Sequence, residues 1–178
     1  FGGCRIEYVL EKEPLGTGGA LMFCHESLVF EESFLLLNGD TFFAVELSAL
    51  EEKALYNNAD WGFSLFRTNN KVRYLPAHLS ESDELYFLPQ GNSKDVMQTS
   101  WANGGVYWVN PRALEPFHKY QRPLSLESEI FPAAALLGQV FCGLRCDGEF
   151  IDIGLPLDYS RAQNMSCFLD ARNYKSGR

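Results

Sequence analysis

Four apolar residues, Phe34 to Leu37, run directly into the turn sequence Asn38-Gly39-Asp40. A short, continuous apolar run that ends in turn residues is typical of a strand buried on both faces of a sheet. This interpretation places Asp40 just beyond the C-terminal end of the strand, at the edge where open α/β sheets bind ligands. A carboxylate there is a hard oxygen ligand that suits Mg²⁺ on a phosphate substrate. Asn-Gly-Asp is equally an ordinary turn, because glycine adopts positive φ and Asx side chains bond to the nearby backbone.

Predicted strands and helices alternate along the chain, which indicates an α/β fold. Strands are predicted where apolar, β-branched and aromatic residues cluster, at 5–10, 34–37, 61–66, 105–109, 140–144 and 150–153, with a further one at 85–87 in the irregular segment 68–100. Helices are predicted at 20–29, 48–56, from 111, from 125 and at 156–169. Ser48 and Ser125 are predicted N-caps, and Pro132 is expected to interrupt or restart its helix.

Length and charge limit the function classes. A chain of 178 residues is expected to form one domain, spanning 1–178. The net charge of −8 argues against nucleic-acid binding, which needs basic patches, although it permits nucleotide binding. The apolar stretches are too short to cross a bilayer, so we expect no membrane partner. The five cysteines lack zinc-ligand spacing, which favours reduced thiols in a cytoplasmic protein.

Three further motifs have both a structural and a functional interpretation. The loop Pro14 to Gly19 is neither a dinucleotide fingerprint nor a P-loop, yet its glycines allow backbone N–H groups to approach an anion. Asp152, flanked by two isoleucines, needs a partner: an ion pair, a cap, or a cation shared with Asp40. Asn103 is either a turn residue or an amide that binds a sugar hydroxyl, and the helix dipole alone would explain Glu127.

Taken together, five motifs in order along the chain resemble those of the sugar-1-phosphate nucleotidyltransferases. They are Glu11-Lys12-Glu13-Pro14-Leu15-Gly16-Thr17-Gly18-Gly19-Ala20, Leu37-Asn38-Gly39-Asp40-Thr41-Phe42-Phe43, Asn103-Gly104-Gly105-Val106-Tyr107, Ser125-Leu126-Glu127 and Phe150-Ile151-Asp152-Ile153-Gly154. The first two look most similar to D-glycero-α-D-manno-heptose-1-phosphate guanylyltransferases, and next to mannose-1-phosphate guanylyltransferases. The resemblance implies a Rossmann-like, three-layer α/β/α fold of the GT-A type with a mixed sheet.

The resemblance also implies a reaction. A nucleoside triphosphate, GTP by preference, and a sugar 1-phosphate would give a nucleotide sugar and pyrophosphate in the cytoplasm, for lipopolysaccharide or capsule synthesis. Asp40 and Asp152 would be catalytic and would hold Mg²⁺. The implied nucleotide-binding residues are Glu13, Leu15, Gly16, Thr17 and Gly18, with Glu13 accepting from guanine N1–H and N2–H₂. The implied sugar-binding residues are Asn103, Gly104 and Glu127. The sequence leaves the oligomeric state open: it is compatible with a homo-oligomer, in which exposed aromatic residues between Trp101 and Trp108 would line the subunit contact.

The chain departs from the family's pattern in three places. Family members carry a Gly-Gly-x-Gly-Thr-Arg phosphate loop about 60 residues upstream, whereas this chain begins at Phe1 without an initiator Met or a secretory signal. We therefore expect either a fragment, the C-terminal three quarters of the domain, or a truncated gene product. Leu75 and Gln90 replace a glycine and a lysine near the sugar phosphate, with Lys94 close by. These departures motivate an alternative, a catalytically impaired relative that binds a nucleotide sugar or a partner subunit.

Overall fold

The structure is a computed structural model that describes residues 5–68, 74, 76–80, 84–86 and 101–165. The helices are α1 (Gly16–Leu28), α2 (Leu47–Tyr56), α4 (Phe131–Leu136) and α5 (Pro156–Ala162), with the 3₁₀ helix η1 (Pro111–Phe117) and the π-helical turn η2 (Leu126–Ile130). The strands are β1 (Phe34–Leu37), β2 (Thr41–Phe43), β3 (Trp61–Arg67), β4 (Pro76–Leu79), β5 (Leu85–Tyr86), β6 (Trp101–Val109), β7 (Phe141–Arg145) and β8 (Phe150–Asp152).

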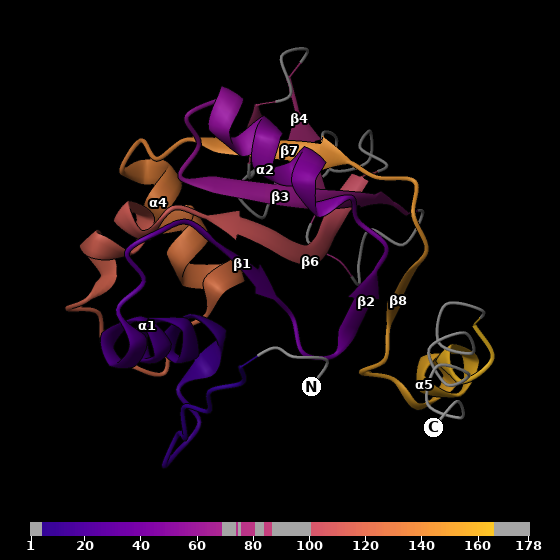
Figure 1. The fold of residues 1–178 in the computed structure, drawn as a ribbon, viewed down its shortest axis with the longest axis horizontal. Coiled ribbons are helices and arrows are strands. Elements are labelled where there is room, and N and C mark those ends of the chain that lie inside the picture. The colour runs from indigo at the N-terminus through magenta and orange to yellow at the C-terminus, as the bar shows by residue number, and fades with distance from the viewer. Residues whose placement is uncertain (1–4, 69–73, 75, 81–83, 87–100, 166–178) are drawn as a thin grey trace.

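Six of these strands form a mixed central sheet. Its order is β5-β4-β6-β3-β7, and β1 also pairs with β6. β3 is parallel to β7 and antiparallel to β6. β2 and β8 form a separate antiparallel pair that extends toward α5 (Figure 1).

Each face of the sheet has its own apolar core. On one face, α2 packs Leu50 and Ala54 against Trp108 and Cys142. On the other face, α1, η1, η2 and α4 cover a cluster of aromatic and aliphatic side chains centred on the fully buried Phe63 and on Tyr107. Helices on both faces of a mixed sheet confirm the predicted three-layer α/β/α fold.

Two strand predictions were wrong because strands depend on their neighbours. The segment 5–10 is an exposed coil, in which Tyr8 and Leu10 are 89% and 85% accessible. Its alternating pattern does not make a strand, since no described strand pairs with it. β1 exists as predicted but is not buried on both faces: within the described sheet it pairs only with β6, and Leu35 and Leu37 are exposed.

Several element boundaries also differ from the prediction. α1 begins at Gly16 instead of at residue 20, and β6 begins at Trp101, so that Asn103 lies inside the strand. Ser48 is not an N-cap: its hydroxyl donates to Glu46 Oε1 over 2.7 Å, and the helix begins at Leu47. β4 was not predicted at all.

Two details of the helices were confirmed. Ser125 caps η2 by accepting a hydrogen bond from the backbone N–H of Ser128, and α4 restarts the helix at Phe131, next to Pro132.

No described helix has the length and hydropathy needed to span a membrane. The three cysteines in the described part of the chain are free thiols. The prediction of exposed aromatic residues between Trp101 and Trp108 was wrong, because Tyr107 and Trp108 are buried in the cores.

The carboxylate of Asp60 joins three elements at one end of the central sheet. It accepts hydrogen bonds from Arg112 Nε (2.6 Å) in η1 and from the backbone N–H of Val140 (2.8 Å), just before β7. The backbone carbonyl of Asp60 also accepts from Asn110 N–H over 3.0 Å. Because Asp60 is only 9% exposed, this side chain fixes where β3, β7 and η1 meet.

We predict that Asp60→Ala lowers the free energy of unfolding by about 2 kcal/mol, since it removes the acceptor of a charged hydrogen bond and of a partly buried N–H. Urea denaturation followed by circular dichroism measures this. Glu52→Ala, on the exposed face of α2, is the control and should change the value by less than about 0.5 kcal/mol. Equal effects of the two substitutions would contradict the role of Asp60.

Candidate functional site

β6 changes its partner on one edge part-way along its length. Its C-terminal residues 106–109 pair with β1, whereas Trp101 and Ala102 pair with β4. β3 follows the opposite edge, with a register shift between Phe63 and Leu65. Gly105, between the two halves, has φ +73°. The edge of β6 therefore opens between β1 and β4, and a cavity lies at this opening.

This polar cavity has a volume of about 230 Å³. Its walls come from β6, from the turn after β1, from η2 and from the β2–β8 pair, and they consist of Asn38, Asp40, Thr41, Tyr74, Asn103, Gly104, Gly105, Glu127, Phe150 and Asp152. All five residues predicted for the metal and the sugar line it.

Two carboxylates meet where β2 and β8 pair. Thr41 is opposite Asp152 in the ladder, and the carbonyl of Asp40 accepts from Ile153 N–H over 2.8 Å. A Cβ atom on Gly154 would lie 3.0 Å from Asp152 Oδ1 and 3.5 Å from Asp40 Oδ2, so one oxygen of each carboxylate lies near the same point. Asp152 Oδ1 also accepts from Gly154 N–H over 2.9 Å, which is the local cap that the sequence allowed. Within the described residues no group of three or more His, Cys, Asp or Glu could hold a metal ion. A cation at this pair would therefore take further ligands from substrate and water.

The side chain of Asn103 is held by its neighbours in β6. Its Nδ2 donates to the hydroxyl of Tyr107 (2.7 Å), and its Oδ1 accepts from Gly105 N–H (3.1 Å). Burial raises the pKa of Tyr107 well above its usual range, against the opposing effect of the hydrogen bonds from Asn103 and Asn38. Tyr107 is therefore a neutral, fixed partner that orients the Asn103 amide.

There is no room for a side chain at Gly104 or at Gly105. A Cβ on Gly104 would lie 2.4 Å from a ring carbon of Phe43, and one on Gly105 would lie 2.8 Å from Asn38 Nδ2. The backbone of Asn38 is held as well, because its N–H donates to the carbonyl of Gly105 over 2.9 Å. The turn that carries Asp40 is thereby attached to the middle of β6.

Glu127 is not used to cap its helix. The backbone N–H of Ser125 donates instead to Glu129 Oε2 over 2.7 Å, which completes the cap with the Ser125 side chain. Glu127 Oε2 accepts from Thr17 Oγ1 (3.2 Å) and from Ser125 Oγ (3.4 Å). Glu129 therefore completes the cap. Glu127 also lies in the first turn of η2, where the helix dipole favours it, and in addition it lines the cavity.

The predicted nucleotide-binding loop is the first turn of α1, packed against residues 124–126. Gly18 N–H donates to the carbonyl of Leu124 over 2.8 Å, and Leu124 N–H donates to the carbonyl of Leu15 over the same distance. A Cβ on Gly16 would lie 2.6 Å from the Leu124 oxygen. These glycines thus allow a close approach of the chain to itself. Glu13 is exposed in the preceding coil and lines neither cavity described here.

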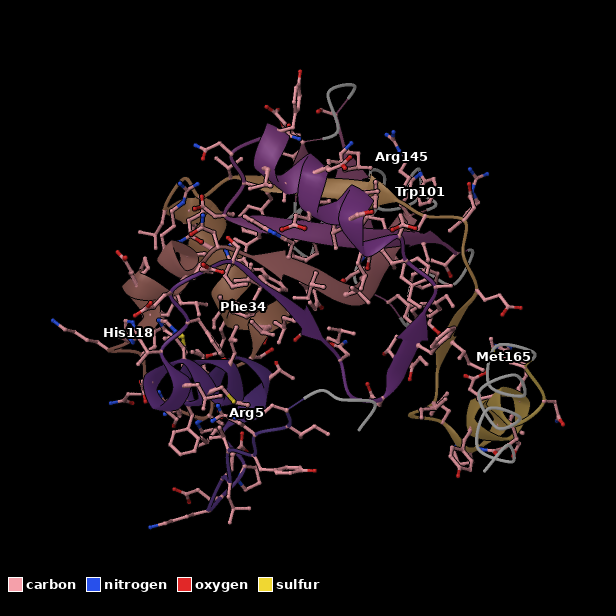
Figure 2. All side chains as sticks on the ribbon, in the orientation of Figure 1. Arg5, Phe34, Trp101, His118, Arg145 and Met165 are labelled. Atoms are coloured by element: carbon pink, nitrogen blue, oxygen red, sulfur yellow. The ribbon has the colours of Figure 1, made fainter. Side chains whose placement is uncertain are left out.

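A second, largely apolar cavity of about 780 Å³ lies between α1 and β1. Phe34, labelled on β1 in Figure 2, is one of its walls, and Thr17 is a polar one. Asn38 and Asp40 line both cavities, so the two are adjacent at the turn after β1.

Five lining residues were not predicted as site residues: Asn38, Thr41, Tyr74, Gly105 and Phe150. Asn38 and Thr41 flank Asp40 in the motif already identified, so their positions were a usable signal. Tyr74 stands directly before Leu75, in a segment that the resemblance places near the sugar. Its position beside Phe150 (ring centroids 5.5 Å apart) depends on the tertiary structure. Leu75, Gln90 and Lys94 lie outside the described residues.

No family model matches the sequence. The relatives found by comparison with known proteins are sugar-1-phosphate guanylyltransferases. The chain is 33% identical over 163 residues to the D-glycero-α-D-manno-heptose 1-phosphate guanylyltransferase of Aneurinibacillus thermoaerophilus, covering 92% of this chain and 68% of the relative. It is 34% identical over 160 residues to the enzyme of the same name from Campylobacter jejuni, covering 89% and 66%. The mannose-1-phosphate guanylyltransferase catalytic subunit beta of Xenopus tropicalis is 29% identical over 159 residues, covering 88% and 43%.

A solved structure agrees with these relatives. The crystal structure of HddC from Yersinia pseudotuberculosis complexed with GMP-PN superposes with a TM-score of 0.69 at 25% identity, over 89% of this chain and 65% of that one. The chain therefore spans about two thirds of the length of the bacterial relatives it matches.

We predict opposite effects for two glycine substitutions near the site. Gly105→Ala should lower the free energy of unfolding by about 2 kcal/mol, because positive φ and the Asn38 side chain both oppose a Cβ atom. Gly39→Ala should leave it unchanged or raise it by about 0.5 kcal/mol, because nothing lies within 4 Å of the added atom. Chemical denaturation of both variants tests this, and equal destabilisation would contradict it.

We predict that Tyr107 makes the fold sensitive to alkaline pH. An unfolded tyrosine ionises near pH 10, whereas buried Tyr107 keeps its proton at that pH. The unfolded state then binds fewer protons than the folded state, so stability falls as the pH rises above about 10. Tyr107→Phe, less stable by about 1 kcal/mol at pH 8, should approach the wild type by pH 11. A difference that stays constant with pH would refute this.

Proposed function

Because the chain belongs to the sugar-1-phosphate nucleotidyltransferases, we propose that it transfers a nucleotidyl group, GMP from GTP, to a sugar 1-phosphate of the heptose or mannose type. The products are a nucleotide sugar and pyrophosphate. The guanylyltransferase names of the relatives support the choice of base. The observation that carries the proposal is that two cavities of different chemistry meet at Asp40.

The polar cavity suits the sugar. Asn103 keeps one Nδ2 hydrogen and one Oδ1 lone pair beyond its bonds to Tyr107 and Gly105, and Glu127 offers a carboxylate. Amide and carboxylate groups together can donate to and accept from hydroxyl groups. Gly104 contributes backbone to the wall between them, and its missing side chain leaves room for the Phe43 ring.

The larger cavity suits the nucleotide. Its apolar walls, which include Phe34, offer surface for a base. Thr17, which belongs to the segment Leu15 to Gly18 at the start of α1, lines this cavity. We assign Glu13 to guanine recognition as a prediction from sequence, because a carboxylate can accept from both N1–H and N2–H₂.

Asp40 and Asp152 fit a divalent cation, Mg²⁺. Two carboxylates with oxygens near one point are a hard-oxygen donor pair of the kind that Mg²⁺ takes in proteins. Mg²⁺ bound there supplies positive charge against the charge of the phosphates. The pairing of β2 with β8 holds Asp40 and Asp152 next to each other. The hydrogen bond from Ile153 N–H to the carbonyl of Asp40 keeps the two strands in register.

In the reaction, a phosphate oxygen of the sugar 1-phosphate attacks the α-phosphorus of the nucleotide. The new P–O bond forms as the bond to pyrophosphate breaks, in line with it. Little covalent work falls to the protein in such transfers, so positioning accounts for most of the acceleration. Adjacent cavities that share Asn38 and Asp40 provide this positioning.

The direct test is pyrophosphate release from the purified protein with Mg²⁺, GTP and D-glycero-α-D-manno-heptose 1-phosphate. Mannose 1-phosphate and the other nucleoside triphosphates are the comparators. We expect turnover that depends on both substrates and is fastest with GTP. Binding of a nucleotide sugar without any turnover would favour the catalytically impaired relative instead.

We predict that Asp40→Asn and Asp152→Asn each lower kcat at least about a hundredfold, since each removes charge that holds the cation. Circular dichroism should show an unchanged fold, because both side chains lie at the cavity and outside the cores.

The control for both variants is Glu52→Gln, which removes an exposed carboxylate on α2 and should retain wild-type turnover. If Asp40→Asn turned over at the wild-type rate, the metal assignment would be wrong.

A further inference from the structure

Thr17 lies where α1 and η2 meet, and the backbone fixes its position there. Gly18 N–H and Gly19 N–H both donate to the carbonyl of Leu124, over 2.8 and 3.0 Å. Leu124 N–H returns a bond to the carbonyl of Leu15 over 2.8 Å. Three backbone hydrogen bonds therefore hold the first turn of α1 against the chain just before Glu127.

The hydroxyl of Thr17 makes two bonds whose directions are determined. Its Oγ1 accepts from the backbone N–H of Leu126 (2.9 Å) and lies 3.2 Å from Glu127 Oε2. Because an N–H group can only donate, it occupies a lone pair of the hydroxyl oxygen. The single hydroxyl proton is then free to point at the carboxylate, where it makes a charge-assisted hydrogen bond.

Ser125 repeats this arrangement from the other side. Its Oγ accepts from Ser128 N–H (3.2 Å) and donates to the same Oε2 of Glu127 (3.4 Å). One carboxylate oxygen thus receives two hydroxyl donors whose orientation the backbone sets. Within the described part of the chain, no hydrogen bond reaches the other oxygen, Oε1, and Glu127 lines the polar cavity.

We propose that Thr17 is a positioning residue for the sugar 1-phosphate, which it serves by holding the Glu127 carboxylate with one oxygen free for a sugar hydroxyl. This inference rests on the proposed function. It gives Thr17 a role other than contact with the nucleotide, although it stands in the segment predicted to bind the base. It also joins the two substrate cavities, because Thr17 lines the apolar one and Glu127 the polar one.

Two substitutions separate the hydroxyl from the shape of the side chain. Thr17→Val keeps the volume and removes the hydroxyl, whereas Thr17→Ser keeps the hydroxyl. We expect Thr17→Val to raise KM for the sugar 1-phosphate roughly tenfold, as for loss of a hydrogen bond to a charged group. KM for GTP should change much less, because valine keeps the shape of the wall that residue 17 presents to the apolar cavity. Thr17→Ser should restore the wild-type KM. Ser27→Ala is the control, since it removes a hydroxyl that, among the residues the structure describes, bonds only to Phe23 O within the same helix.

A second measurement tests the contact without substrate. Hydrogen exchange at the Leu126 amide should accelerate in Thr17→Val and stay at the wild-type rate in Thr17→Ser, because only the latter keeps the acceptor. Unchanged exchange in Thr17→Val would show that the contact does not exist. Faster exchange with an unchanged KM for the sugar 1-phosphate, or with a raised KM for GTP alone, would overturn the positioning role.

The exchange experiment also separates this inference from the proposed function. A wild-type protein that turns over no sugar 1-phosphate would overturn the function and with it the role for Thr17. The Leu126 exchange would still report whether Thr17 holds the turn that carries Glu127.

Discussion

The site depends on the interruption of β6 at Gly105. Positive φ at this glycine and the register shift against β3 let one strand serve two different neighbours on the same edge, β4 first and then β1. An uninterrupted ladder would fill that edge with backbone hydrogen bonds and leave no cavity. The interruption places Asn103 and Gly104 in the wall of the polar cavity, and Asn38 packs against Gly105, which has no side chain.

The remaining polar groups reach this opening from segments that are distant in the sequence. The β2–β8 pair brings Asp40 and Asp152 together, and the packing of α1 on η2 joins Thr17 to Glu127 across 110 residues. The Glu127 carboxylate accepts from the hydroxyl groups of Thr17 and Ser125, whose directions the backbone sets. The Asn103 amide is held by Tyr107 and by Gly105 N–H. Such pre-organisation suits a reaction in which the protein mainly positions two charged substrates.

Patterns along the chain predicted the central elements well. Apolar runs identified the strands now seen as β1, β3, β7 and β8 and the C-terminal half of β6, because burial against a helical layer selects such residues wherever the strand stands in the order. The errors fall where a neighbour decides the outcome. Residues 5–10 alternate but pair with no described strand, and β1 is as apolar as a central strand yet has one exposed face.

Residue types and their spacing were enough to establish the α/β class and the family, and to single out two carboxylates that line the polar cavity. These features depend on local chemistry and on motif order. The partners of those residues came only from the folded chain. A glycine-rich turn has the same composition whether it approaches a nucleotide or, as here, the carbonyl of Leu124. Likewise, no local pattern shows that the Thr17 hydroxyl meets Glu127, because a hydrogen bond between residues 110 positions apart exists only after the layers have packed.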